Sequence, residues 1–293
     1  MNDLYIILTA TLVSASCALL GSFLILRRMA MVGDAISHAV LPGIVIAFLL
    51  SGSRDSVTML LGAGIIGMFT TFLIEFFHKK ARLQTDASIG VTFTWLFAIG
   101  VVMISLFAGK VDLDQDCVLY GEIAYVPLDV IITPNGTNIG PKALYVSGII
   151  LIVNLMFVLL FYRKLFLTTF DPAYAQAIGI STALWHYALM GAVSMTTVAS
   201  FESVGAILVV ALLIAPAATA YLLTDNFKGM LLLSCMVGAV ASVGGYYLAV
   251  WLDGSIAGAI ASVAGVLFFM AMLFSPSQGL LMKRNKIKTH AIN

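Results

Sequence analysis

Long apolar runs separated by short polar segments fill almost the whole of this sequence. A helix needs about 20 residues to cross a bilayer, and runs of this length fall at about 5–26, 33–50, 56–77, 88–108, 143–163, 183–200, 203–223, 229–251 and 254–274. The pattern predicts an all-α polytopic membrane protein with nine spanning helices, or eight if one run is broken or re-entrant. The runs leave no room for a soluble domain, so we expect residues 1–293 to form a single transmembrane domain.

The composition agrees with this prediction. The chain of 293 residues is 61% hydrophobic and 10% charged, with a mean hydropathy of +1.06, whereas soluble domains carry about 25% charged residues. The net charge of +1 gives no sign of a nucleic-acid partner, and membrane lipid is the expected surrounding. Cys17, Cys117 and Cys235 indicate no disulfide framework, because two lie in apolar runs and one in a loop. The first residues lack a basic segment, so we expect no cleaved signal peptide.

The basic residues between the runs predict the orientation of the chain. Twelve of the fifteen Lys and Arg residues fall on one side of an alternating topology, at 27–28, 79–82, 163–164, 228 and 283–288. Cytoplasmic loops are enriched in Lys and Arg. We therefore expect the N-terminus outside the membrane and the C-terminus in the cytoplasm.

Two ionisable residues, Asp34 and His38, lie four positions apart in the second apolar run. On a helix this spacing puts both side chains on one face, with Cβ atoms roughly 6 Å apart. A carboxylate and an imidazole together suit a divalent cation such as Mn(II), Zn(II) or Fe(II). Ionisable groups in a membrane segment cost about 2.5–3.5 kcal/mol each, so they usually face a bundle interior or a transport path. Two ligands are too few for a tight site. Two copies of the chain would supply four, which favours a dimer with the path on its axis.

The residues around this pair refine the prediction and also offer a structural alternative. Pro42 has no N–H for the carbonyl of His38, so either that oxygen is free beside the pair or the helix bends there. Small residues would let another helix or a dehydrated ion approach closely; they are Gly33, Ala35, Ser37, Ala39 and Gly43. Alternatively, Asp34 caps the helix or pairs with Arg27 or Arg28, and His38 hydrogen-bonds to a neighbouring helix.

A short helix is predicted between two spanning segments on the cytoplasmic side. Asp171 can act as its N-cap and Pro172 as its first residue, and Gly179 can close it. A helix of about two turns is too short to cross the membrane, but it would present apolar residues for docking a partner; these are Phe170, Tyr174 and Ile178. The alternative is an ordinary connecting helix.

Acidic residues mark the opposite side of the membrane. The segment 108–142 is the longest external connection, and its acids would concentrate cations at a negative mouth; they include Asp112, Asp114, Asp116, Glu122 and Asp129. Each of them can equally belong to a solvated loop. Glu202 is expected at the start of a helix, where capping is favoured over a role as a gate. Three other histidines, His78, His186 and His290, are interpreted as structural.

The chain lacks a G-x-x-x-x-G-K-[ST] nucleotide-binding motif, since residues 136–142 have the wrong spacing. If ATP drives transport, the nucleotide site must therefore lie on another chain. No Ser/His/Asp or Cys/His arrangement suggests an intramembrane hydrolase, so this chain is not expected to be an enzyme.

Three segments resemble motifs of the permease subunits of manganese, zinc and iron-chelate ABC importers. They are residues 21–43, GSFLILRRMAMVGDAISHAVLPG, residues 170–180, FDPAYAQAIGI, and residues 204–220, VGAILVVALLIAPAATA. The first segment is long and specific, and the similarity covers essentially the whole chain. Residues 116–124, DCVLYGEIA, are most similar to the manganese branch of this family, although residues 133–142 extend the loop beyond its usual length.

The resemblance implies a type II ABC importer-like fold in a prokaryotic cytoplasmic membrane, with eight to nine spanning helices. It implies a dimer of two copies or of two paralogues, two cytoplasmic ATPase subunits that hold the ATP, and an extracytoplasmic binding protein that delivers the metal ion. The metal site of the family falls on Asp34 and His38. Its coupling helix falls on 170–180, which adds Ala177 to the docking residues. Mn(II) is the favoured ion, ahead of Zn(II) and Fe(II).

Two other functions compete with this interpretation. A secondary transporter or channel could use Asp34 and His38 to relay protons or metal ions, but it would not need the short helix at 171–179. An importer of siderophores or corrinoids would keep the ATP drive, but such cargo needs a wide path. A close Asp/His pair suits a bare ion better.

Overall fold

The structure is a computed structural model that describes residues 2–52, 56–107, 123–132 and 138–275. Its helices are α1 (Asn2–Leu26), α2 (Val32–Ala39), α3 (Leu41–Ser51), α4 (Ser56–Lys80), α5 (Thr85–Phe107), α7 (Lys142–Phe170), α8 (Pro172–Ala177), α9 (Thr182–Val204), α10 (Ala206–Leu223), α11 (Phe227–Leu252) and α12 (Ile256–Phe274). A 3₁₀ turn, η1 (Ile123–Tyr125), and a small hairpin of β1 (Val130–Ile132) and β2 (Asn138–Pro141) precede α7. The predicted all-α membrane fold is confirmed, with this small hairpin as an addition.

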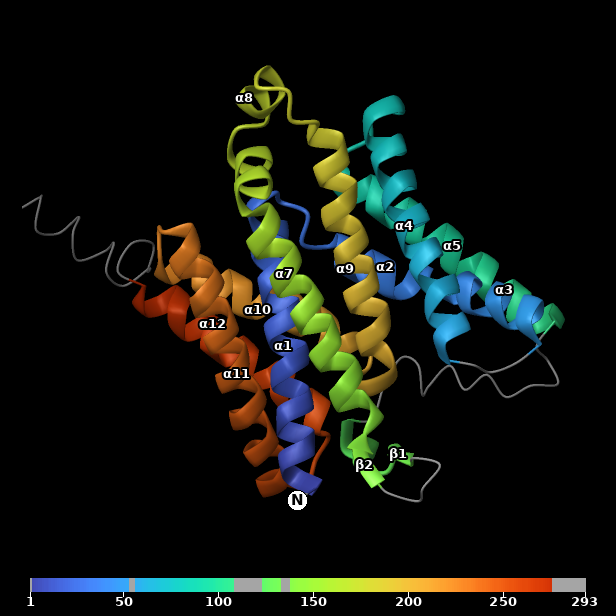
Figure 1. The fold of residues 1–293 in the computed structure, drawn as a ribbon, viewed down its shortest axis with the longest axis vertical. Helices are drawn as coiled ribbons and strands as arrows, with labels where there is room; N and C mark the ends of the chain where they lie inside the picture. The colour runs from blue at the N-terminus through green and yellow to red at the C-terminus, as the bar shows by residue number, and fades with distance from the viewer. Residues whose placement is uncertain (1, 53–55, 108–122, 133–137, 276–293) are drawn as a thin grey trace, which may run out of the picture.

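Helix α1 lies at the centre of one group of helices, where it packs against α7, α10 and α11 (Figure 1). Burial of apolar surface does not drive helices together in lipid, so small residues and hydrogen bonds hold such contacts. Ser22 of α1 donates to Ser234 of α11 at 3.1 Å. A Cβ placed on Gly21 would lie 1.9 Å from the carbonyl oxygen of Leu213 in α10. Only glycine permits this approach, which brings α1 and α10 into backbone contact.

The second apolar run is not one continuous helix. It divides into α2 and α3 at Val40, where the N–H groups of Gly43 and Ile44 both donate to the Val40 carbonyl, at 2.9 and 3.1 Å. Pro42 causes the break because it cannot donate to the carbonyl of His38. The helix is thus interrupted locally at Val40, although Val40 itself keeps a helical conformation and residues 32–51 form one membrane-spanning element.

Helices α3, α4 and α5 form a second group beside α2. A Cβ on Gly43 would lie 2.5 Å from the carbonyl oxygen of Gly62, so α3 and α4 meet through two glycines. Helix α5 packs closely against α3 at Gly100. A Cβ at this position would lie 2.9 Å from side-chain atoms of Leu41 and of Pro42. Helix α9 contacts both groups, since it packs against α4 and against α7.

The boundary between α9 and α10 differs from the prediction. Helix α9 continues to Val204, and the chain turns at Gly205, which has φ +79°. The backbone of Glu202 therefore lies in the last turn of α9, so the position expected for it, at the start of a helix, is wrong. The sequence misled here because Gly205, three residues further on, is the residue that can leave the helical conformation.

Eight elements in the described part of the chain are long and apolar enough to cross a membrane, counting α2 and α3 as one. Helix α9 has 23 residues but a more polar composition. It runs from α8 back toward the hairpin, antiparallel to α7 (Figure 1). With α9 included, the described helices match the nine runs of the sequence.

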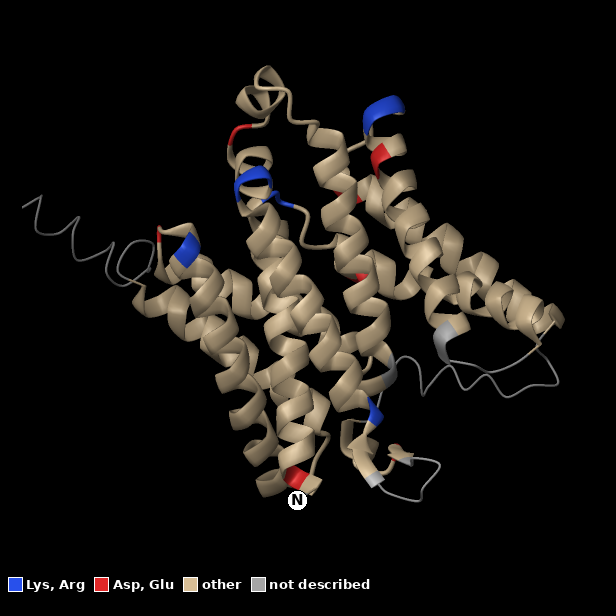
Figure 2. Cartoon of the chain, in the orientation of Figure 1, with Lys and Arg blue, Asp and Glu red and all other residues tan. Residues whose placement is uncertain are grey.

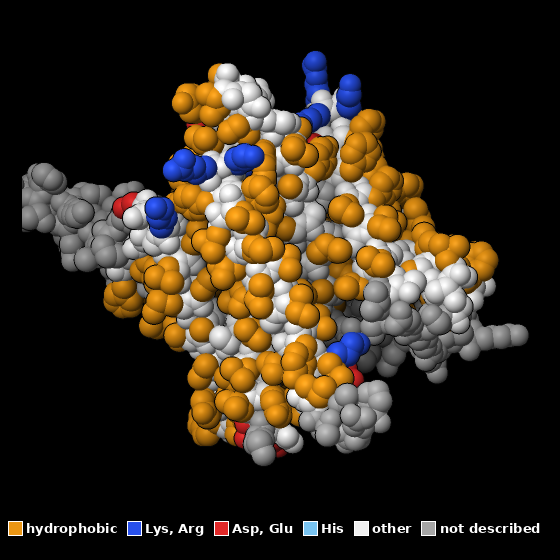
Figure 3. All heavy atoms as spheres, viewed as in Figure 1, with side chains coloured by type: hydrophobic (Ala, Val, Ile, Leu, Met, Phe, Trp, Pro, Cys, Tyr) orange, Lys and Arg blue, Asp and Glu red, His pale blue; other side chains and the backbone are white. Residues whose placement is uncertain are grey.

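Charged residues lie mainly at the ends of the bundle (Figure 2). The end that carries α8 also carries most of the described Lys and Arg residues, including the last residues of α4 and the turn after α1. The visible face between the two ends is largely apolar (Figure 3). This distribution is that of a multi-pass membrane protein with an apolar girdle.

Candidate metal site and docking helix

Asp34 and His38 face the same side of α2, as their spacing predicts. The His38 Nε2 and Asp34 Oδ1 atoms are 3.6 Å apart, and the two side chains are 37% and 33% exposed. This distance is long for a hydrogen bond. One metal ion could contact both atoms, since bonds from such ions to nitrogen and oxygen are about 2.0–2.2 Å long. The pair is thus half-buried, close together and open to a ligand.

Two aromatic rings of α5 lie beside His38. The His38 ring centre lies 5.8 Å from that of Phe93 and 6.1 Å from that of Phe97. Behind α2, the side chain of Leu213 lies 3.2 Å from where a Cβ of Gly33 would be. These contacts hold α2 and orient the imidazole. They leave one face of Asp34 and His38 free for an ion.

The structural alternatives for Asp34 are not supported. The N-cap of α2 is Met31, and no side chain caps this helix. Arg27 instead donates to the hydroxyls of Thr168 and Thr169 in α7, both at 3.0 Å. Burial lowers the pKa of Arg27 to about 10, so it is still charged at neutral pH. Within the part of the chain that the structure describes, neither Arg27 nor Arg28 forms an ion pair with Asp34. The turn at Arg28, with φ +59°, separates α1 from α2.

Among the described residues, no third side-chain ligand lies with this pair. In the residues that the structure covers, no group of three or more His, Cys, Asp or Glu side chains could hold a metal ion. A divalent ion at Asp34 and His38 would therefore complete its coordination with water, a backbone oxygen or a second chain.

Helix α8 forms much as the sequence predicts. Asp171 is its N-cap and accepts from the N–H of Tyr174 at 2.9 Å, and Pro172 is its first residue. The helix has six residues, somewhat shorter than two turns, and Gly179 follows with φ +83°. Phe170, Tyr174 and Ile178 are each about half exposed, and Ala177 is exposed as well. Helix α8 projects from the end of the bundle, with no other helix beyond it (Figure 1).

Most of the acidic residues proposed for a mouth or gate lie outside the described residues. These are Asp112, Asp114, Asp116 and Glu122. The backbone of Glu202 is described but its side chain is not. Asp129 is exposed beside the hairpin and lines a cavity with Tyr125 and Lys142.

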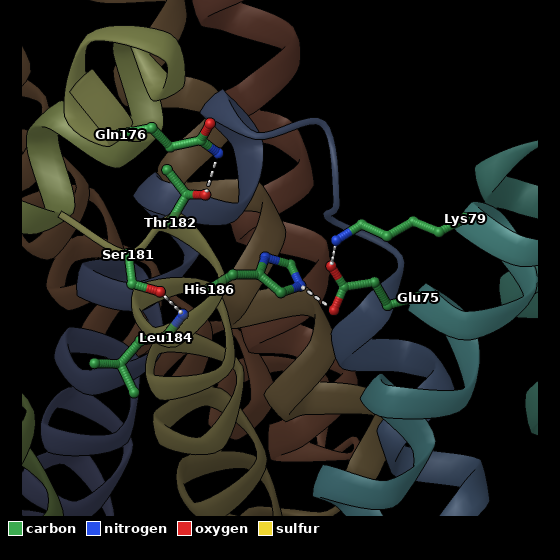
Figure 4. Close-up of polar contacts among 7 residues, drawn as sticks. All are labelled: Glu75, Lys79, Gln176, Ser181, Thr182, Leu184 and His186. Atoms are coloured by element: carbon green, nitrogen blue, oxygen red, sulfur yellow. Dashed lines mark hydrogen bonds and ion pairs between the residues drawn. The ribbon is translucent and has the colours of Figure 1, made fainter. Parts of the chain in front are cut away.

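Sequence reasoning missed a second pair of a carboxylate and a histidine, in addition to Asp34 and His38. Glu75 of α4 and His186 of α9 face each other, with 3.8 Å between Oε2 and Nε2 (Figure 4). Lys79 pairs with the other carboxylate oxygen of Glu75. The signal was available for Glu75, which is an ionisable residue within an apolar run like Asp34. His186 was interpreted as structural together with His78, whose Nδ1 lies 2.9 Å from the Leu83 carbonyl oxygen. His290 lies outside the described residues.

Comparison with known proteins extends over nearly the whole chain. Residues 4–275 match the family described as the ABC 3 transport family. The manganese transport system membrane protein MntD of Bacillus subtilis is 49% identical over 96% of this chain and 95% of its own length. The zinc transport system membrane protein TroD of Treponema pallidum is 44% identical over 94% of this chain and 75% of its own. The solved structure of PsaBC from Streptococcus pneumoniae in complex with Fab superimposes with a TM-score of 0.77 at 30% identity, covering 97% of this chain and 94% of that chain.

Proposed function

Because this chain belongs to the ABC 3 transport family, we propose that it is the membrane permease of an ATP-driven importer of a divalent transition metal. Relatives named for manganese and zinc transport support a metal as the cargo. Mn(II) is the favoured ion, because the relative that is 49% identical is a manganese transport protein. Zn(II) and Fe(II) are the alternatives.

The Asp34–His38 pair carries this proposal. It offers a hard oxygen and a borderline nitrogen to one ion, within a membrane-spanning element. The carboxylate charge offsets part of the cost of stripping water from a divalent cation. In a dimer of this chain, or of this chain with a paralogue, two such pairs would supply four ligands on a shared path.

The remaining partners follow from the two ends of the bundle. The exposed residues of α8 would dock onto a cytoplasmic ATPase subunit, a separate chain that binds ATP. An extracytoplasmic binding protein would deliver the ion to the opposite end. In this arrangement the protein lies in a prokaryotic cytoplasmic membrane with its N-terminus outside. A channel or secondary transporter would have no use for an exposed six-residue helix held by its own cap.

The proposal is tested by uptake of Mn(II) into vesicles that contain the permease with its ATPase and binding protein. Asp34→Ala and His38→Ala are each expected to abolish uptake, because each change removes one of the two donors in every copy. His78→Ala is the control, since His78 is exposed at the end of α4. Uptake at the original rate in Asp34→Ala and His38→Ala would show that the pair is not the metal site.

A further inference from the structure

Glu75 and His186 form a buried polar contact between two helices that the proposed metal site does not use. The Oε2 atom of Glu75 and the Nε2 atom of His186 are both buried, and neither has a hydrogen-bond partner among the residues that the structure describes. They are 3.8 Å apart, beyond hydrogen-bond distance. Lys79 pairs with the other oxygen of Glu75, the Tyr187 hydroxyl also interacts with the Glu75 carboxylate, and Arg27 is the other charged group near His186. Buried polar groups without partners are rare in proteins, so this open pair calls for an explanation.

On one side, this contact is tied to α8. Only residues 178–181 separate α8 from α9. The Gln176 side chain of α8 donates to the Thr182 hydroxyl at 2.9 Å, and Ser181 caps α9 (Figure 4). His186 follows Thr182 by four residues, so both side chains lie on one face of α9. A displacement of α8 must therefore move the first turns of α9, and His186 with them.

On the other side, the contact is tied to the helix that carries the metal pair. A Cβ on Gly67 of α4 would lie 1.9 Å from the Ser194 hydroxyl of α9 and 3.2 Å from the Ile36 side chain of α2. Ile36 lies between Asp34 and His38 in the sequence. Glu75 follows Gly67 by eight residues, which is about 12 Å along α4. Helix α4 thus contacts α9 at Glu75 and, two turns away, contacts α2 beside the metal pair.

We propose that Glu75 and His186 pass movement of α8 to α4, and through α4 to the helices that carry Asp34 and His38. They are positioning residues for transport, and this inference rests on the proposed function. A shift of α9 toward α4 by about 1 Å would bring Nε2 and Oε2 within hydrogen-bond distance. The contact has an open arrangement, seen here, and a closed one. Packed helix interfaces turn small shifts into such discrete steps.

The test measures how many ATP molecules are hydrolysed per Mn(II) ion taken up, in vesicles holding the complete transporter. Glu75→Gln removes the negative charge, and His186→Gln removes the imidazole ring. Both variants keep the approximate size of the side chain. Each is expected to raise the ATP hydrolysed per ion about tenfold, within the usual range for coupling between sites. Equilibrium binding of Mn(II) by the purified complex should change less than about twofold. His78→Gln, on the same helix but exposed at its end, should leave the ratio unchanged.

A variant that carries both substitutions shows whether Glu75 and His186 act together or independently. If Glu75 and His186 act through each other, Glu75→Gln combined with His186→Gln should be no worse than either single change. Wild-type ratios in both single variants, or losses that multiply in the double variant, would overturn the inference. So would loss of Mn(II) binding in parallel with uptake. If one single variant fails to assemble, the ratio of ATP hydrolysed to Mn(II) taken up in the other variant still tests the inference. Failure of the proposed function would appear instead as normal uptake by Asp34→Ala.

Discussion

Gly21 shows how much of this bundle depends on single residues without side chains. Its position against the Leu213 carbonyl leaves no space for a methyl group. Gly21→Ala is therefore expected to lower the free energy of unfolding by about 1–3 kcal/mol or more, because the obstructing atom is backbone and cannot rotate away.

Thermal unfolding of the purified protein in detergent would measure this loss. Gly148→Ala is the matched control, since no atom lies within 4 Å of a Cβ at that position in α7. Its unfolding temperature should be unchanged or slightly higher, because alanine favours a helix over glycine. Equal unfolding temperatures for both variants would mean that α1 and α10 do not pack closely in the membrane.

Pairs of site residues can be predicted from the sequence when both residues lie on one helix. Asp34 and His38 could be paired from the sequence because a helix fixes the geometry of residues four positions apart. Glu75 and His186 come from α4 and α9, and only the packing of these helices brings them together. Gly67 and Ser194 set that packing, and a single sequence does not show which glycine meets which neighbour.

Among the elements, α8 is the helix for which the sequence contained signals for both the start and the end. An N-cap, a first-position proline and a glycine with positive φ all come from neighbouring residues, so its ends could be predicted closely. The α9–α10 boundary was wrong because the apolar pattern continues across Gly205 with only Glu202 to interrupt it. The break between α2 and α3 was left open, because a proline can bend a helix or interrupt it.

The exposed residues of α8 make a prediction for the element as a whole. Tyr174→Asp or Ala177→Asp should uncouple ATP hydrolysis from Mn(II) uptake, because docking would bury an unpaired charge against the ATPase. Mn(II) binding by the permease should be unaffected. Uptake and ATP hydrolysis measured in the same vesicles would show the change.

Gln84→Asp provides the control for this experiment, since Gln84 is exposed in the turn between α4 and α5. It places the same charge at the same end of the bundle but on another element. Normal transport by both α8 variants would rule out α8 as the docking helix.

For the whole molecule, the distribution of basic residues predicts which end faces the cytoplasm. By the alternating pattern of apolar runs, twelve of the fifteen Lys and Arg residues are expected on the side that carries α8. In a variant without Cys117, cysteine placed at Gly254 should react with an impermeant reagent added outside whole cells. Cysteine placed at Gln84 should react only after the cells are opened. Gly254 has open space around it and Gln84 is exposed, so both positions are accessible. Labelling of both from one side would mean that α9 or another helix does not cross.

The polar composition of α9 has a consequence for how the protein is made. A segment with histidine, glutamate and several hydroxyl residues enters the lipid poorly when it leaves the translocon alone. Its main neighbours, α4 and α7, are both synthesised before it. By the time the ribosome reaches α9, a protein surface is already present in the membrane to receive its polar side chains. The order of helices along the chain therefore favours biogenesis, because the more polar α9 is delivered to helices that are already in place.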